Sequence, residues 1–451
     1  MYKFNAQELA GFARHYGFHY DCINPQTLVK EILLEMEMGL EGKTSSLAMI
    51  PSHISPVTNI PHGKTVLALD AGVTNLRSSL VYFNENSEVI AQGTKRCAMP
   101  GTNGQVNAQE FFNTIADAAI PLLKETKVEG IGFTFSYPME ITSDADGILL
   151  SFSKEVDAPD VIGKTIGKGL REALAEKGFK YSGPIVMLND TVATLLSGLA
   201  AISPDGESTR TRNDFGVNAG PVIGFILGTG VNTAYTETSI PKIKFNSRTS
   251  SHIVVCETGG FNVRYRGQLD AEYDSTTKNP GYYFLEKATS GAYLGPLTLH
   301  ILKHAVKEKL IQFKKSDDLF IMQSLETKTL NDFLHAPLTA QGHLGSLFAP
   351  NESDALAAVQ YLASIVTERG ALFSAAVLAA AVRRLNPGYE PYSPVRIAVE
   401  GTTYLLYKGM RRSVESHLHQ ILYTDKPLPY VVTPVEQASL FGAAVAALRK
   451  K

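Results

Sequence analysis

Short apolar runs that end in polar, glycine-containing turns recur along the chain and predict buried strands. The clearest runs lie at 65–70, 131–135, 185–188, 222–227 and 395–400, with a shorter strand or turn at 147–155. Longer stretches between them have apolar residues three or four positions apart, which predicts amphipathic helices. The main examples are 109–124, 161–177, 355–366, 371–385 and 435–448. Strands and helices mixed in this way indicate an α/β protein.

Two stretches share the pattern of a strand, a short polar turn and a second strand. The first, at 65–83, contains the turn Gly72-Val73-Thr74-Asn75, and the second, at 222–235, contains Gly228-Thr229-Gly230. The two hairpins are separated by about the length of one domain, which indicates a structural duplication.

Composition adds bounds on the architecture and the partners. At 451 residues the chain exceeds the length at which one core keeps growing, so two domains are expected. A net charge of -2 gives no reason to expect nucleic acid or an anionic membrane as partner. The longest mostly apolar run, 371–382, is too short to span a bilayer, and no targeting segment is evident at the amino terminus.

The cysteines bear on the compartment. Cys22, Cys97 and Cys256 are odd in number and widely spaced, with neither a CxxC pair nor a disulfide framework. This pattern favours a reducing environment, so we expect a cytoplasmic protein.

Asp190 stands at the junction between a buried strand, 185–188, and a helix that starts near Thr191. Open α/β sheets place their ligands at the carboxyl ends of strands, and a helix amino terminus favours negative charge. A purely structural alternative is that Asp190 caps the helix, because aspartate is a favoured capping residue.

The glycine turns restrict the phosphate chemistry. The chain contains no GxxxxGK[ST] and no GxGxxG after a first strand, which argues against a P-loop NTPase and a dinucleotide-binding fold. A glycine turn between two strands offers backbone N–H groups to phosphate oxygens with no Cβ in the way. Each turn taken alone is more simply explained as a plain hairpin, because glycine and asparagine often form such turns. The third glycine-threonine step, Gly401-Thr402, makes a shared phosphate role the better interpretation.

Five segments carry a family resemblance. In chain order they are LALDAGVTNLR, IGFTFSYP, LNDTVATLLSG, GFILGTGVNTAY and AVEGTTYL, and together they resemble the hexokinase family of the sugar kinase, actin and Hsp70 superfamily. The resemblance runs from about residue 49 to the end. It implies a two-domain actin-like ATPase fold, in which each domain has a mixed five-stranded sheet with flanking helices and a cleft lies between the domains. It places a small domain at 65–190 plus 435–451 and a large domain at 1–64 plus 191–434.

The resemblance also implies an activity and roles for individual residues. The activity is ATP-dependent phosphorylation of a hexose at its 6-hydroxyl, the first step of glycolysis, with Asp190 as the general base. The sugar would be held by polar groups that suit its hydroxyls, namely Ser136, Ser153, Lys154, Asn189, Asn232, Glu257 and Glu286.

The nucleotide and its metal would be held mainly by the two hairpin turns. Phosphates would contact Asp70, Gly72, Thr74, Asn75 and Arg77 on one side and Gly228, Thr229 and Gly230 on the other, with Gly401 and Thr402 near the adenosine. Asp70 would bind Mg²⁺ through water, which suits a hard cation, and Asp190 is a second candidate ligand.

Three departures from the family pattern keep an alternative open. Val73 replaces a usual glycine, Thr258 replaces a tryptophan, and 439–442 reads Ser-Leu-Phe-Gly where Ser-Gly-Lys-Gly is frequent. They motivate a catalytically weak sugar-sensing regulator as the rival to a kinase. The sugar-side residues argue against an actin-like or chaperone-like ATPase. The sequence does not decide the preferred hexose or the oligomeric state.

Overall fold

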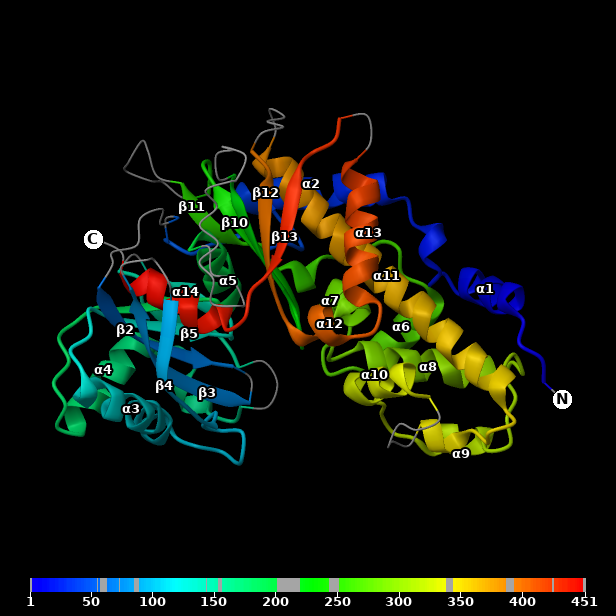
Figure 1. Cartoon of the computed structure of the whole chain (residues 1–451), viewed down its shortest axis with the longest axis horizontal. Coiled ribbons are helices and arrows are strands. Elements are labelled where there is room, and N and C mark those ends of the chain that lie inside the picture. The colour runs from blue at the N-terminus through cyan, green and yellow to red at the C-terminus, as the bar shows by residue number, and fades with distance from the viewer. Residues whose placement is uncertain are drawn as a thin grey trace.

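The strands of the computed structural model form two large sheets, joined by helices that lie between them (Figure 1). The structure describes residues 2–448 except 55, 57–62, 73, 85–88, 143, 153–155, 201–219, 243–250, 338–343, 387–392 and 424–425. Val73 and the predicted sugar-binding residues Ser153 and Lys154 therefore lie outside the described residues.

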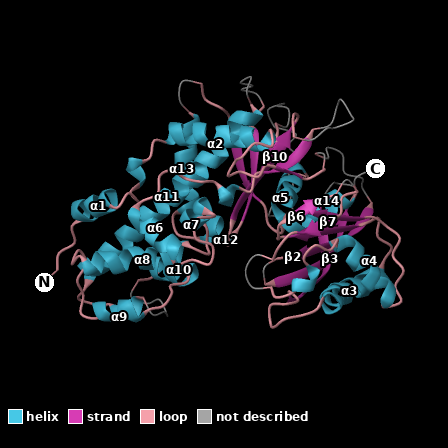
Figure 2. Cartoon of the chain, turned by 180° about the vertical axis from the view of Figure 1, so that it is seen from behind, coloured by secondary structure: helices cyan, strands magenta, loops and turns pink. Residues whose placement is uncertain are grey.

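The first sheet is mixed, with the strand order β4-β3-β2-β5-β8. Its strands are β2 (Lys64–Ala71), β3 (Asn75–Phe83), β4 (Val89–Ala98), β5 (Ile131–Phe135) and β8 (Ile185–Leu188). Strands β2, β5 and β8 run parallel, while β2, β3 and β4 are antiparallel neighbours. Helices α3 (Ala108–Glu125) and α4 (Ile166–Glu176) pack together on one face of this sheet, next to the small β6 (Met139–Ile141) and β7 (Gly147–Leu149) pair (Figure 2).

The second sheet is also mixed, with the order β1-β11-β10-β9-β12-β13. Its strands are β1 (Ile50–Pro51), β9 (Val222–Leu227), β10 (Val231–Glu237), β11 (His252–Val255), β12 (Val395–Glu400) and β13 (Tyr430–Pro434). It holds one strand more than the expected five, because the two-residue β1 adds to the edge at β11. Strand β9 pairs antiparallel with β10 and parallel with β12.

The rest of the second body is helical and surrounds α11 (Ser353–Leu385). Its helices are α1 (Ala6–His15), α2 (Pro25–Leu40), α6 (Gln268–Ser275), α7 (Phe284–Thr289), α8 (Leu294–Lys307), α9 (Ser316–Ile321), α10 (Thr327–His335), α12 (Thr402–Leu406) and α13 (Met410–Leu422). Short 3₁₀ turns occur at Tyr20–Cys22, Pro159–Val161, Thr258–Gly260 and Gly345–Leu347.

Helix α11 merges two helices that the sequence predicts separately. Gly370 lies inside it without breaking it, and a Cβ there would stand 2.9 Å from the backbone oxygen of Ala288, so the glycine permits close packing with α7. The helix is long and apolar enough to cross a membrane, but 94% of its most apolar window is buried inside the protein. Its composition is thus explained by a core position.

Two helices connect the sheets. Helix α5 (Asp190–Leu199) packs on β9 and β12 of the second sheet, and α14 (Ala438–Ala447) packs on β2 and β5 of the first. The two helices pack against each other, and a Cβ at Gly442 would stand 2.0 Å from the backbone oxygen of Ala193. This layered arrangement confirms the two-domain actin-like fold class. The exact domain boundaries remain predictions.

Candidate active site

The carboxyl ends of three parallel strands bring predicted site residues to one edge of the first sheet. Ala71 at the end of β2 accepts a hydrogen bond of 3.1 Å from the backbone amide of Ser136, which follows β5. Next to β5, strand β8 pairs Leu188 with Thr134, so Asn189 emerges at the same edge. Ser136 thus lies beside the end of the Asp70 strand, and Asn189 lies one strand further along the same edge.

Asp190 begins α5, and its neighbour provides the cap. Asn189 has extended backbone, and its side-chain oxygen accepts a hydrogen bond of 2.8 Å from the amide of Thr191. The alternative in which Asp190 caps the helix is therefore wrong. Its carboxylate accepts a hydrogen bond of 3.2 Å from the Thr191 hydroxyl and stands where the helix dipole favours negative charge.

Asp70 and Arg77 face each other across the first hairpin and form an ion pair. The Nε of Arg77 donates to Oδ2 of Asp70 at 2.8 Å, and a second guanidinium nitrogen donates to the same oxygen. Burial raises the pKa of the Asp70 carboxyl, the Arg77 charge opposes that rise, and Asp190 adds to it. Arg77, which the resemblance places near phosphate, is thus also the counter-ion of a buried aspartate.

The turn of the first hairpin is closed by a backbone hydrogen bond and further fixed by side chains. The Gly72 amide donates to the Asn75 carbonyl at 2.9 Å, and the Asn75 amide group donates to the Thr74 hydroxyl at 2.6 Å. Arg96 of β4 donates to the side-chain oxygen of Asn75 at 2.9 Å. Thr74 and Asn75 are thus held in one network that faces the end of β2.

The turn of the second hairpin is fixed by the backbone around it. The Gly228 carbonyl accepts from the Gly291 amide and from the Thr403 hydroxyl, each at 2.8 Å. The Gly228 amide donates to Gly230, and the Thr229 carbonyl accepts from Ala292. Among the described residues, these bonds leave the amides of Thr229 and Gly230 for a ligand. The turn can therefore offer N–H groups to an anion, as predicted.

The backbone conformation and the close packing at position 401 require glycine. It has a φ of 121°, and a Cβ there would stand 2.3 Å from the backbone oxygen of Leu227. Because β12 runs parallel to β9, the Gly401 turn lies directly beside Gly228. Thr402 follows as the exposed first residue of α12. Two of the three glycine-threonine elements are thus neighbours in space.

The predicted sugar-side residues of the second body form one polar cluster. The side-chain nitrogen of Asn232 donates to the Glu257 carboxylate at 3.0 Å. The side-chain oxygen of Asn232 accepts from the backbone amide of Thr258 at 3.2 Å. Glu286 at the start of α7 accepts from the backbone amide of Val231 at 3.3 Å. All of these groups lie beside the start of β10.

The electrostatics link this cluster to Asp190. Burial raises the pKa of Glu257 to about 7; the Asn232 hydrogen bond opposes the rise, and the charges of Asp190 and Glu286 add to it. Carboxylates that come from both bodies of the protein therefore affect one another. A carboxyl with a pKa near neutrality can donate as well as accept a hydrogen bond.

Glu400 is a site residue that the sequence reasoning missed. Burial raises its pKa to about 7, with Asp70 and Asp190 adding to the rise and Arg77 opposing it. It ends β12 in the second sheet, yet its charged neighbours belong to the first body. A signal was present, because Glu400 precedes Gly401 as Asp70 closely precedes Gly72 at the end of a strand.

The acidic groups fit a hard divalent cation. In the described residues, the hydrogen bonds of Asp70 all use Oδ2, so its other oxygen remains for a water ligand. Burial is the main cause that raises the pKa of Asp70 and of Glu400; the charge of Asp190 adds to both rises, and the charge of Asp70 adds to the rise at Glu400. Oxygen ligands are those that Mg²⁺ prefers.

Comparisons with known proteins assign the family. Two hexokinase family models match this chain, at residues 15–200 and 222–449. The chain is 28% identical to Hexokinase-2 of Candida albicans, over 94% of this chain and 89% of that protein. It is 29% identical to Hexokinase-3 of Homo sapiens, over 86% of this chain but only 41% of that longer protein.

A solved structure supports the same fold. The hexokinase from Schistosoma mansoni complexed with glucose superposes with a TM-score of 0.80 at 24% identity, and the match covers 99% of this chain and 100% of that one.

Proposed function

We propose, from the premise that this chain belongs to the hexokinase family, that it transfers the γ-phosphoryl group of ATP to the 6-hydroxyl of a hexose. The observation that carries the proposal is the convergence of Asp190 with Glu257 and Glu286, which come from the two bodies of the protein. Such a cluster suits a ligand rich in hydroxyls, which need both donors and acceptors. The names of its relatives support a hexose as the substrate.

Asp190 would act as the general base. As the 6-oxygen of the sugar attacks the γ-phosphorus, its proton moves to the Asp190 carboxylate, and the bond from the γ-phosphorus to the bridging oxygen of ADP breaks. A positioned base contributes about 10²- to 10⁴-fold to the rate. The Asn189 cap fixes the start of α5 and thereby the direction of this carboxylate.

The two hairpin turns would position ATP. The amides of Thr229 and Gly230 would bind phosphate oxygens, and the neighbouring Gly401 turn would approach the adenosine side. Arg77 would offset the charge of the transferring group while it remains paired with Asp70. Preorganised positioning and electrostatics of this kind carry most of the acceleration in phosphoryl transfer.

Asp70 would hold Mg²⁺ through water, with Asp190 nearby. The bound cation would supply charge neutralisation at the phosphates. We further propose a cytoplasmic location, which rests only on the three cysteines and their free thiols.

The test is a coupled assay for ADP release with MgATP, run with and without glucose, mannose and fructose. We expect sugar-dependent turnover that falls at least about 100-fold in Asp190→Asn while sugar binding persists. Asparagine keeps the size of the side chain and its acceptor for Thr191, so the fold should remain. Asp117→Asn is the matched control, since Asp117 is an exposed carboxylate of α3 that pairs with Lys177.

Two outcomes would contradict the proposal. Near-normal turnover of Asp190→Asn would show that Asp190 is not the general base. Sugar binding by calorimetry without sugar-dependent turnover in the wild type would instead support the sugar-sensing regulator that Val73 and the 439–442 sequence motivate.

A further inference from the structure

Three side chains with metal-binding atoms meet between α6 and α8. They are Glu272 of α6 and the pair His300 and His304 of α8, whose ligand atoms all lie within 4.8 Å of one another. The two histidines are four positions apart, so they share one face of the helix. Both imidazoles direct Nε2 toward the same carboxylate oxygen of Glu272, at 3.7 Å from His300 and 3.1 Å from His304.

The carboxylate is held in place from its other side. Gln268, one helical turn before Glu272, donates to Oε1 of Glu272 at 2.8 Å. This bond leaves Oε2 directed at the histidines. The three side chains are partly covered, with exposed fractions of 37% for Glu272, 22% for His300 and 24% for His304, so an ion would remain reachable from solvent.

One nitrogen in the cluster lacks a hydrogen-bond partner among the described residues. Nε2 of His300 is buried and, within the described residues, has no hydrogen-bond partner, because 3.7 Å to Glu272 is too long for one. A buried nitrogen without a partner is unfavourable. A metal ion between His300 and Glu272 would satisfy it.

The ligand set indicates which metal. Four-coordinate Zn²⁺ has bonds of about 2.0–2.2 Å to imidazole nitrogen and carboxylate oxygen, which places its ligand atoms roughly 3.3–3.5 Å apart. The two glutamate–histidine separations, 3.1 and 3.7 Å, lie on both sides of this spacing, and the imidazole pair lies within 4.8 Å. Mg²⁺ and Ca²⁺ prefer oxygen ligands alone, whereas two imidazoles and one carboxylate suit zinc.

We propose that Glu272, His300 and His304 form a binding site for a zinc-class divalent transition-metal ion, with water in the fourth position. The site is separate from the proposed active site, since α6 and α8 lie in the helical part of the second body, away from the first sheet (Figures 1 and 2). It does not depend on the proposed function.

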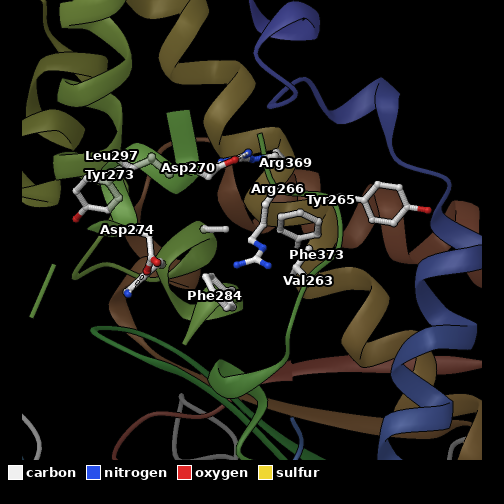
Figure 3. A pocket seen from close by; sticks show the side chains of 12 residues that line it. Val263, Tyr265, Arg266, Asp270, Tyr273, Asp274, Phe284, Leu297, Arg369 and Phe373 are labelled. Carbon is white, nitrogen blue, oxygen red and sulfur yellow. Dashed lines mark hydrogen bonds and ion pairs between the residues drawn. The ribbon is translucent and has the colours of Figure 1, made fainter. Parts of the chain in front are cut away.

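The other face of α6 is already anchored, which gives the site a rigid base. Asp270 forms two hydrogen bonds with Arg369 of α11, at 2.6 and 2.7 Å, and Asp274 pairs with Lys287 of α7 (Figure 3). These pairs line a narrow cavity of about 20 Å³, enough for a single water but not for a sugar. A metal would add a link from α6 to α8. Helix α6 is already paired with α7, the helix that carries Glu286.

The experiment is calorimetric titration of metal-free protein with Zn²⁺. It uses a Cys22→Ser/Cys97→Ser background, because these exposed thiols would bind zinc themselves. We expect one Zn²⁺ per chain, with affinity at least about 100-fold lower in His300→Ala/His304→Ala. Tetrahedral Co²⁺ absorption in the visible should appear in the background protein and be lost in the double variant.

The controls separate this site from other histidines and from misfolding. His417→Gln removes a histidine that also contacts one glutamate, Glu368 at 3.0 Å, and should leave Zn²⁺ binding unchanged. Glu272→Gln keeps the size of the side chain and should weaken binding. Unfolding curves of metal-free variants show whether the fold persists. Absence of Zn²⁺ binding, or binding that survives the double variant, would overturn the proposal.

Discussion

The two hairpins follow one plan but are stabilised by different groups. Around the β2–β3 turn, charged side chains supplement the backbone bond from Gly72 to Asn75, with Arg77 on Asp70 and Arg96 on Asn75. Around the β9–β10 turn, the Gly228 carbonyl is held by a backbone amide and by the hydroxyl of Thr403. The first hairpin therefore supplies charge, and the second supplies unobstructed backbone.

This difference assigns different tasks to two similar sequence patterns. A buried ion pair depends on both partners, because removing one leaves an uncompensated charge. A glycine turn depends on the absence of side chains, so any Cβ disturbs it. The following predictions test this contrast, from the largest expected effect to the smallest.

Arg77→Met should have the largest effect, because Asp70 would remain as a buried and unpaired carboxylate. We expect a loss of about 3–5 kcal/mol in the free energy of unfolding and a fall of about 100-fold in turnover. Urea unfolding and the ADP-release assay measure the two effects. In Asp70→Asn/Arg77→Met the stability should largely return while turnover stays low. Equal losses in the single and double variants would show that the pair is not coupled.

Gly401→Ala should disturb the β9–β10 turn, which is held mainly by backbone groups. The strained φ and the approach to Leu227 predict a loss of about 2–3 kcal/mol and a raised KM for ATP. Gly409→Ala is the matched control, since Gly409 has a φ of 84° but, its chain neighbours aside, no atom of the described residues within 4 Å of its missing Cβ. It should cost about 1 kcal/mol and leave KM unchanged. If both variants behave alike, the contact with Leu227 is unimportant.

Glu257 and Glu400 should make stability fall as pH rises. Each has a pKa of about 7 in the folded protein, above the usual value of about 4.3 in the unfolded chain. Folding then binds protons, so each group costs nothing below about pH 4, and its cost grows by about 1.4 kcal/mol for each pH unit up to about pH 7. Glu400→Gln should flatten this slope in urea unfolding between pH 5 and 8. An unchanged slope would show that Glu400 does not titrate there.

Thr403→Val should give the smallest effect. It removes the hydroxyl that donates to Gly228, with an expected loss of about 1 kcal/mol and a few-fold higher KM for ATP. Thr298→Val removes a similar buried bond, of 2.7 Å to Leu294 within α8, far from the hairpin. Its loss of stability should be similar, with no change in KM. A KM effect in both variants would point to general destabilisation.

Local patterns were sufficient for much of the fold. Strands 131–135 and 185–188 have the predicted bounds, because each is a short apolar run bounded by polar residues. Strand β4 was not predicted, because its residues are mostly exposed and polar, as in VIAQGTKRCA at a sheet edge. The helix predicted from 161 begins at Ile166, after a 3₁₀ turn at Pro159–Val161.

The candidate site also contains residues that local sequence patterns predict and one that they do not. Asp190, Asp70 and Gly401 were predicted from their sequence positions, because strand ends and glycine turns leave local signals. Glu400 was missed, because its importance comes from Asp70, Arg77 and Asp190, which are distant in sequence.

The sequence by itself determined which carboxylates and glycines stand at strand ends, since that depends on backbone propensity and on hydrophobic periodicity over a few residues. Only the tertiary structure decided which of those groups act together. Coulomb interactions depend on distance and burial, and both are set by the packing of α5 and α14 between the two sheets. For the same reason Glu272, His300 and His304, unremarkable along the chain, form a cluster only when α6 packs on α8.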